Sequence, residues 1–327
     1  DAAGGIPVRI IYYYNPGDFS TQGREKLMKK ELVFRGAATA LVTPFDSAGI
    51  DFAAMAKMIE FQLTNGIDAL VVCGTTGESA TLSDAEKRSL IEFTVRQTRG
   101  RVPVIAGTGG NCTARAASLS EFAAKAGADA LLVVTPYYNK CTQAGLVSYY
   151  RTISEASGLP YIAYSVPART GMRIEPRTAL EISLDKNAAG LKDAGDSISE
   201  TAKTISLCGS ALPVYSGNDD RILPVLSLGG KGVVSAAANL IPGSIKRLCS
   251  LYFDCRVSAA AKLQTALIPL CEALFREVNP IPLKAALAAE GMCRNILRAP
   301  LTELSEQNLR ALTEAISDFR AEGDTRL

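Results

Sequence analysis

From residue 35 onward, short apolar runs alternate with segments of helical periodicity. The apolar runs are rich in Ala, Val, Ile and Leu, and they occupy residues 37–45, 69–74, 102–107, 130–138, 159–166, 188–192, 212–217 and 230–235. Helical periodicity lies between them, for example at residues 52–63, 84–97, 113–126, 142–156 and 176–184. Strands that are apolar throughout and alternate with helices indicate a parallel sheet covered by helices. Eight such units predict an α/β fold, a (β/α)8 TIM barrel, over residues 35–240.

Two segments flank the predicted barrel. Residues 241–327 form a C-terminal helical region, with helices expected at 257–277, 281–297 and 303–320, packed on the barrel. Residues 1–34 combine an apolar-aromatic run with a charged segment, without the order of elements that a signal peptide has. We interpret residues 1–34 as an N-terminal extension to which the pattern assigns no role.

Several helix ends carry recognisable residues. Ser83 and Glu86 are spaced as a capping box at the start of a predicted helix. Gly127 and Gly158 follow predicted helices, where a left-handed residue is often needed.

Composition excludes several classes of protein. The 35 basic and 33 acidic residues balance, and no basic stripe indicates nucleic-acid binding. No apolar run reaches the ~18–20 residues of a membrane span, so we expect no membrane partner. The chain has no histidine, so acid–base chemistry must use other side chains, and no His metal ligand exists. The eight cysteines lack CxxC spacing, which favours reduced thiols in a cytoplasmic protein.

Polar residues follow nearly every predicted strand, at the end where barrel enzymes carry their chemistry. These clusters lie at residues 74–78, 107–111, 135–139, 164–170, 192–193, 217–220 and 235–239. The glycines at 107–110 lack the third glycine of a dinucleotide loop, since Cys112 stands there, and no P-loop occurs. We therefore expect neither a cofactor nor a metal.

Lys192 ends the small apolar run at residues 188–191. A lysine stem inside such a strand loses hydration, which favours the neutral amine that can attack a carbonyl and form an imine. The alternative is a lysine that extends to water at the mouth of the strand.

Two tyrosines and an arginine favour the chemical interpretation. Tyr138 and Tyr164 end neighbouring strands, and with Thr75 they could relay protons where histidine is absent. Alternatively, each tyrosine is a rim residue with a buried ring. Arg169, in a loop beside Tyr164, could bind a carboxylate through both nitrogens, or form a surface ion pair.

These residues together resemble the dihydrodipicolinate synthase / N-acetylneuraminate lyase family, from about residue 34 to about residue 316. The resemblance rests on the order of the motifs GTTGE at 74–78, PYYN at 136–139, YSVPARTG at 164–171, GLKD at 190–193 and NPIPLK at 279–284.

The resemblance implies a lyase that binds pyruvate as a Schiff base on Lys192 and condenses it with aspartate semialdehyde, in the diaminopimelate route to lysine. It implies that Thr75, Tyr138 and Tyr164 form the proton relay, with Tyr138 entering a neighbouring subunit's site. It further implies a homotetramer built from tight dimers. Residues implied to bind substrate are Thr75 and Thr76 for the pyruvate carboxylate, Arg169 for the second carboxylate, and Gly217 and Val234 at the pyruvate pocket.

Within the family, Arg169, Thr75-Thr76 and the PYYN motif favour this reaction over sialic-acid cleavage. Ser165 departs from the usual Asn, but strand alternation should point it away from Tyr164. Two alternatives stay open: a pyruvate aldolase acting on a sugar acid, and a non-catalytic binding relative.

The region matching the family's lysine-inhibition site contains two cations, Lys87 and Arg115. Its residues are Ser79, Ala80, Asp84, Lys87, Asn111, Arg115 and Tyr137. Because these cations would repel the ammonium groups of lysine, we expect weak or absent inhibition.

Overall fold

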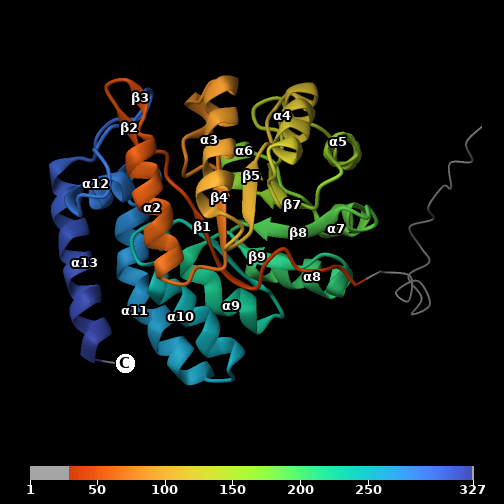
Figure 1. The fold of residues 1–327 in the computed structure, drawn as a ribbon. Coiled ribbons are helices and arrows are strands. Elements are labelled where there is room, and N and C mark those ends of the chain that lie inside the picture. Colours follow the sequence, from red (N-terminus) through yellow and green to blue (C-terminus); the bar gives the residue numbers. More distant parts are fainter. Residues whose placement is uncertain (1–28, 326–327) are drawn as a thin grey trace, which may run out of the picture.

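A computed structural model describes residues 29–325, so most of the predicted extension, residues 1–28, lies outside the described residues. Eight parallel strands close into a barrel in the order β1-β4-β5-β6-β7-β8-β9-β10, which confirms the predicted fold (Figure 1). The strands are β1 (Gly36–Ala40), β4 (Ala69–Val72), β5 (Val104–Gly107), β6 (Ala130–Val134), β7 (Tyr161–Ser165), β8 (Ala188–Asp193), β9 (Val214–Ser216) and β10 (Gly232–Ser235). β2 (Phe45–Asp46) and β3 (Gly49–Ile50) form a separate antiparallel pair.

Helices surround the barrel, and four short 3₁₀ helices lie in its loops. The helices are α2 (Phe52–Thr64), α3 (Asp84–Thr98), α4 (Thr113–Lys125), α5 (Gln143–Ser157), α6 (Pro167–Thr170), α7 (Pro176–Ser183), α8 (Ile198–Cys208), α9 (Ile222–Ser227) and α10 (Pro242–Phe253). The 3₁₀ helices are η1 (Ser79–Thr81), η2 (Gly209–Ala211), η3 (Asp219–Arg221) and η4 (Ala237–Asn239). The predicted capping box at Ser83 is present in α3, and Gly158 ends α5 in a left-handed conformation.

Apolar residues form two cores. A large cluster fills the layer between the barrel and its helices, and a smaller one fills the barrel interior. Tyr164, Tyr215 and Val234 belong to the interior cluster. The ring of Phe34, just before β1, stacks on Tyr215 with 4.4 Å between centroids, and this contact closes the interior at the amino-terminal end of β1. Aromatic rings therefore fill the barrel interior at the amino-terminal end of β1, and the polar residues lie at the opposite, carboxyl ends of the strands.

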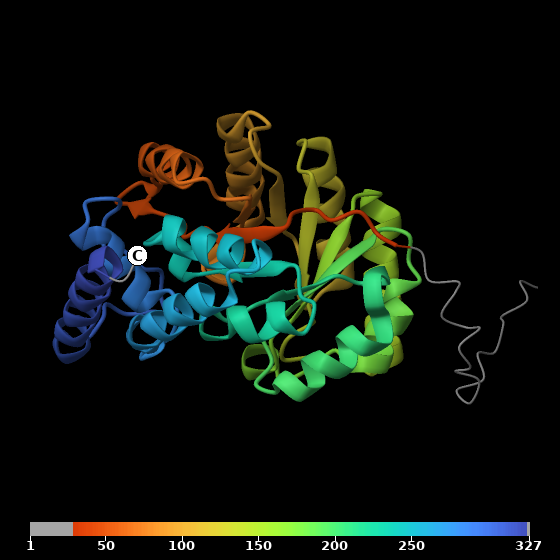
Figure 2. The same ribbon diagram turned by 90° about the horizontal axis from the view of Figure 1, so that it is seen from below.

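The C-terminal region consists of α11 (Val257–Phe275), α12 (Ile281–Ala289) and α13 (Glu306–Thr325). These helices lie together on one side of the barrel, beside α2 and the β2–β3 pair (Figures 1 and 2). The predicted helix at 281–297 was wrong at its end, because Gly291 has a φ of +64° and stops α12.

Several strands are also shorter than predicted, among them β1, which ends at Ala40 rather than at residue 45, and β6. β6 ends at Val134, since Pro136 has no N–H for a strand ladder and Tyr138 has a φ of +71°. No helix within residues 29–325 is long and apolar enough to cross a membrane.

Candidate active site

Lys192 and Tyr164 meet inside the mouth of the barrel. They are register partners on β8 and β7, so their side chains point to the same side of the sheet. The Nζ atom of Lys192 lies 4.2 Å from the centroid of the Tyr164 ring. Each residue is 5% exposed, so the amine lies in a largely dry site next to a phenol.

The structure contains a second buried lysine, Lys284, whose amine is occupied. Its Nζ lies 2.5 Å from Glu78 Oε1 and donates to the carbonyl of Ile296 at 2.7 Å. In residues 29–325, by contrast, the Lys192 amine has neither a hydrogen-bond acceptor nor an ion-pair partner. Of the two, Lys192 is therefore the lysine that is free to react with a carbonyl compound.

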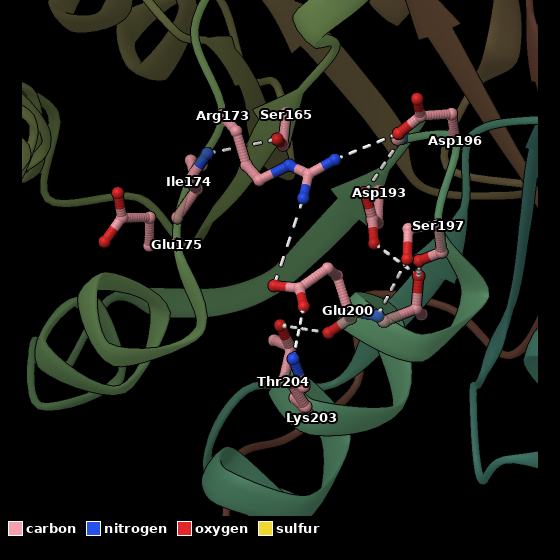
Figure 3. A network of polar contacts seen from close by, with 12 residues as sticks. Ser165, Arg173, Ile174, Glu175, Asp193, Asp196, Ser197, Glu200, Lys203 and Thr204 are labelled. Carbon is pink, nitrogen blue, oxygen red and sulfur yellow. Dashed lines mark hydrogen bonds and ion pairs between the residues drawn. The ribbon is translucent and has the colours of Figure 1, made fainter.

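The residue after Lys192 is anchored on the outside of the barrel. Asp193 accepts hydrogen bonds from the Gly195 N–H (2.9 Å) and the Thr201 hydroxyl (2.7 Å). Arg173 lies beside it and pairs with Asp196 at 2.9 Å and Glu200 at 3.9 Å (Figure 3). These contacts fix the end of β8 and therefore the base of the Lys192 side chain.

The side chain of Ser165 also points to the outside of the barrel. Its hydroxyl accepts a hydrogen bond from the Ile174 N–H at 3.2 Å (Figure 3). Tyr164 belongs to the barrel interior, so the two neighbours point to opposite sides, as alternation predicted.

The loop after β4 contains Thr75 and Thr76. Thr75 is half-buried and Thr76 is 4% exposed, and the Thr76 hydroxyl accepts a hydrogen bond from Asn279 Nδ2 at 3.0 Å. The turn is closed by hydrogen bonds from Gly77 N–H to Gly74 O and from Glu78 N–H to Thr75 O, each of 3.1 Å. In the described chain, the backbone N–H groups of Thr75 and Thr76 have no hydrogen-bond acceptor. They are donors of the kind that a small carboxylate binds.

Arg169 lies on the short helix α6 and is exposed. It donates one hydrogen bond, from Nη2 to the carbonyl of Asn279 at 3.0 Å. No carboxylate pairs with it within the part of the chain that the structure describes. The predicted alternative of a surface ion pair is therefore not found there, and the guanidinium charge is available to an anionic ligand.

Tyr138, the third residue of the predicted relay, is exposed to solvent in the single chain. It is 93% exposed and has a φ of +71°, an uncommon conformation for a side chain of this size. No direct contact joins Tyr138, Thr75 and Tyr164 among the described residues, so the predicted relay stays a prediction.

Gly217 and Val234 lie near the same mouth. The Gly217 N–H donates to the carbonyl of Asp193 at 2.7 Å, and a Cβ at Gly217 would lie 2.6 Å from that of Ala194. Only glycine therefore allows β9 to approach the residues that follow Lys192. Val234 is 1% exposed and belongs to the interior cluster.

The sequence interpretation missed Asp219, a buried acid two residues beyond Gly217. Its Oδ2 accepts hydrogen bonds from the N–H groups of Ala236 (3.1 Å) and Ala237 (2.9 Å), while Oδ1 has no partner in residues 29–325. Burial raises the pKa of Asp219, and the positive charge of Lys192 acts against this shift. The sequence signal for Asp219 was its position in a polar cluster after a strand. Asp220 lies in the same cluster, so this signal does not distinguish the two acids.

A groove of about 980 Å³ lies outside the barrel, between α7 and α8. It is lined by Arg173, Glu175, Pro176, Arg177, Glu200, Ala202, Lys203, Ser206 and Leu207. Two of its cations, Arg173 and Lys203, already pair with Glu200 of the same groove. It contains neither Lys192 nor Tyr164, so we place the chemistry at the barrel mouth instead.

Comparisons with known proteins give one family. The model of the dihydrodipicolinate synthetase family matches residues 33–319. A 4-hydroxy-tetrahydrodipicolinate synthase of Acetivibrio thermocellus is 44% identical over 287 residues, which are 88% of this chain and 98% of that protein. The solved dihydrodipicolinate synthase of Thermotoga maritima is 42% identical with a TM-score of 0.86, covering 88% of this chain and 99% of that chain. That of Cyanidioschyzon merolae, solved with lysine bound, is 35% identical with a TM-score of 0.86, covering 89% and 99%.

Proposed function

The chain belongs to the dihydrodipicolinate synthetase family, and from this premise we propose that it has 4-hydroxy-tetrahydrodipicolinate synthase activity. It would condense pyruvate with L-aspartate 4-semialdehyde in the diaminopimelate route to lysine. The observation that carries the proposal is the buried, unpaired amine of Lys192 beside the Tyr164 ring, inside the barrel mouth.

The proposed reaction begins when the Lys192 amine attacks the keto carbon of pyruvate and water leaves, giving an imine. Loss of a methyl proton converts the imine to an enamine, whose methylene carbon attacks the aldehyde carbon of the semialdehyde. The amine of the semialdehyde then attacks the former keto carbon and displaces Lys192. The net result is one new carbon–carbon bond, one ring and one released water.

The surrounding groups have matching roles in this proposal. Thr75 and Thr76 bind the pyruvate carboxylate through hydroxyl and backbone N–H groups. Tyr164, with Thr75 and a partner subunit's copy of Tyr138, moves protons between the imine and solvent. Arg169 binds the carboxylate of the semialdehyde, which its lack of a carboxylate partner in the described chain supports.

A coupled assay tests the substrate. Pyruvate formation or consumption is followed with aspartate semialdehyde and, in parallel, with a panel of sugar acids. The proposal expects pyruvate to be consumed with aspartate semialdehyde and no turnover with any of the sugar acids. Turnover of a sugar acid without turnover of the semialdehyde would assign the chain to a different aldolase reaction of the same fold.

We also propose a homotetramer built from tight dimers. The support is Tyr138, which is 93% exposed in the single chain although the proposed relay needs its hydroxyl. The eight cysteines are all free thiols, which fits the cytoplasmic location that we propose.

Finally, we propose that lysine inhibits this enzyme weakly or not at all. Lys87 lies on α3 and Arg115 is exposed on α4. Asn139 Nδ2 donates to the carbonyl of Asn111 at 2.8 Å, which brings the Tyr137 loop next to the start of α4. Two cations in this region would repel an effector that carries two ammonium groups.

A further inference from the structure

The C-terminal region contacts the loop at residues 74–78, which we call the threonine loop. Asn279, just before α12, donates from Nδ2 to the Thr76 hydroxyl at 3.0 Å. Lys284 on α12 pairs with Glu78, the last residue of the loop. Two contacts therefore join the barrel mouth to residues about two hundred positions later in the sequence.

The Glu78–Lys284 pair is shielded from water. The side chains of Lys284 and Glu78 are 0% and 1% exposed. Lys284 Nζ also lies 4.1 Å from the centroid of the Phe45 ring, and the Arg298 N–H donates to Glu78 Oε2 at 2.9 Å. Burial lowers the pKa of Lys284, while the charge of Glu78 acts in the opposite direction.

A buried ion pair adds little net stability, because desolvation offsets the attraction between the charges. An apolar pair of similar volume would stabilise the fold as well or better. What this pair supplies is a fixed geometry, since the carboxylate of Glu78 is held by Lys284 on one oxygen and by the Arg298 N–H on the other.

The backbone of Glu78 connects this fixed carboxylate to the rest of the threonine loop. Glu78 has a φ of +54°, a left-handed conformation that a non-glycine residue adopts only when its surroundings hold it there. Its N–H donates to the carbonyl of Thr75 at 3.1 Å, and its carbonyl accepts from the Thr81 N–H at 3.0 Å. A rotation of Glu78 would therefore move Thr75.

We propose that Lys284, through Glu78, and Asn279, through Thr76, are positioning residues that set the threonine loop for the carboxylate of pyruvate. The C-terminal helices thereby determine the affinity for the first substrate. This inference rests on the proposed function, because the binding of pyruvate by the threonine loop is part of that proposal.

Three variants test the inference. E78Q/K284M removes both charges with little change in volume, so that neither charge is left buried alone. N279A removes only the contact with Thr76. R320M is the control. Arg320 of α13 also pairs with an acid next to α12, Glu290 at 2.9 Å, but this pair is exposed, since its side chains are 50% and 37% accessible.

The measurements are KM for each substrate, kcat and Tm. We expect E78Q/K284M and N279A each to raise KM for pyruvate about tenfold or more, because loss of uniform binding raises KM without lowering kcat. KM for the semialdehyde should stay within about twofold of wild type in both variants. kcat at saturating pyruvate should stay within the same range in N279A, whose lost contact is with Thr76 and not with the relay residue Thr75, as should all three constants of R320M.

An unchanged KM for pyruvate in folded N279A, or in folded E78Q/K284M, would overturn the inference. If the double variant does not fold, N279A decides alone. A wild-type enzyme without synthase activity would instead overturn the proposed function, so the two failures are distinguishable.

Discussion

The ring of Tyr164 lies against the Lys192 amine, and its hydroxyl is a group that can carry a proton in the proposed reaction. Tyr164 lies in register with Lys192, and its hydroxyl makes no hydrogen bond within residues 29–325. A phenol in this place can donate to and accept from a substrate bound on the amine. With no histidine in the chain, no imidazole can replace it.

We therefore expect Y164F to lower kcat by about 10²–10⁴-fold, the range that a positioned acid–base group supplies. The control is Y150F, which makes the same chemical change at a buried tyrosine of α5 whose hydroxyl donates to the Val133 carbonyl. Steady-state kinetics of both variants decide the matter. Equal kcat values for Y164F and wild type would remove Tyr164 from the relay.

The prediction of single site residues from the sequence was uneven. Lys192 by itself left open the alternative of a lysine that extends to water, and the tyrosines and Arg169 at neighbouring strand ends favoured the chemical interpretation. Asn279 and Lys284 could be read as a motif, but no pattern shows that they contact Thr76 and Glu78. That information lies in how α12 packs against the barrel, which local sequence does not encode.

At the scale of elements, the start of α3 joins the barrel to the C-terminal region. Glu86 completes the capping box with Ser83 and also pairs with Arg298. The capping box was predicted from spacing alone. The partner Arg298 was not, because it lies outside any expected element of this part of the fold.

This contact predicts a pH dependence of stability. Arg298 holds the pKa of Glu86 at about 2, below its usual 4.5. A lowered folded-state pKa contributes stability above the usual value, and that stability is lost as the pH falls toward the folded-state pKa. We expect E86Q to have a lower Tm than wild type at neutral pH, with a difference that shrinks below about pH 4.5.

Thermal unfolding followed by circular dichroism checks this dependence. E121Q is the control, since Glu121 pairs with the exposed Lys125 on the surface of α4, away from the C-terminal region. A Tm difference between E86Q and wild type that stays constant as the pH falls would contradict the assignment.

Lys87 on α3 and Arg115 near the start of α4 predict how the enzyme responds to lysine. With Lys87 and Arg115 in place, a lysine titration of the wild-type enzyme should reach no half-inhibition at submillimolar effector. The double variant K87A/R115E should be inhibited more strongly, because both repelling cations are removed. Submillimolar half-inhibition of the wild type would show that the two cations do not exclude lysine.

At the scale of the whole molecule, the barrel explains why the site could be predicted at all. Every parallel strand of a closed barrel ends at the same mouth, so polar residues after separate strands must converge. The order of strands therefore predicted that Thr75, Tyr164 and Lys192 share one end. It could not predict where the Tyr138 hydroxyl acts, since in our proposal that depends on a contact between subunits.

Mixing two inactive variants tests that contact. K192M lacks the nucleophile and Y138F lacks the hydroxyl, so each alone should have little activity. In a mixed dimer, one site combines Lys192 of one chain with Tyr138 of the other, and random mixing should restore about a quarter of the sites. No gain in activity after unfolding and refolding the mixture would mean that Tyr138 does not act across subunits.

The most direct test of the account is reductive trapping. Borohydride added to the enzyme with pyruvate reduces the imine to a stable amine, and mass spectrometry of the digested protein locates it. The account predicts one pyruvate adduct, on the peptide containing Lys192, and none on Lys284 or in K192M. An adduct absent from Lys192, or unchanged in K192M, would contradict it.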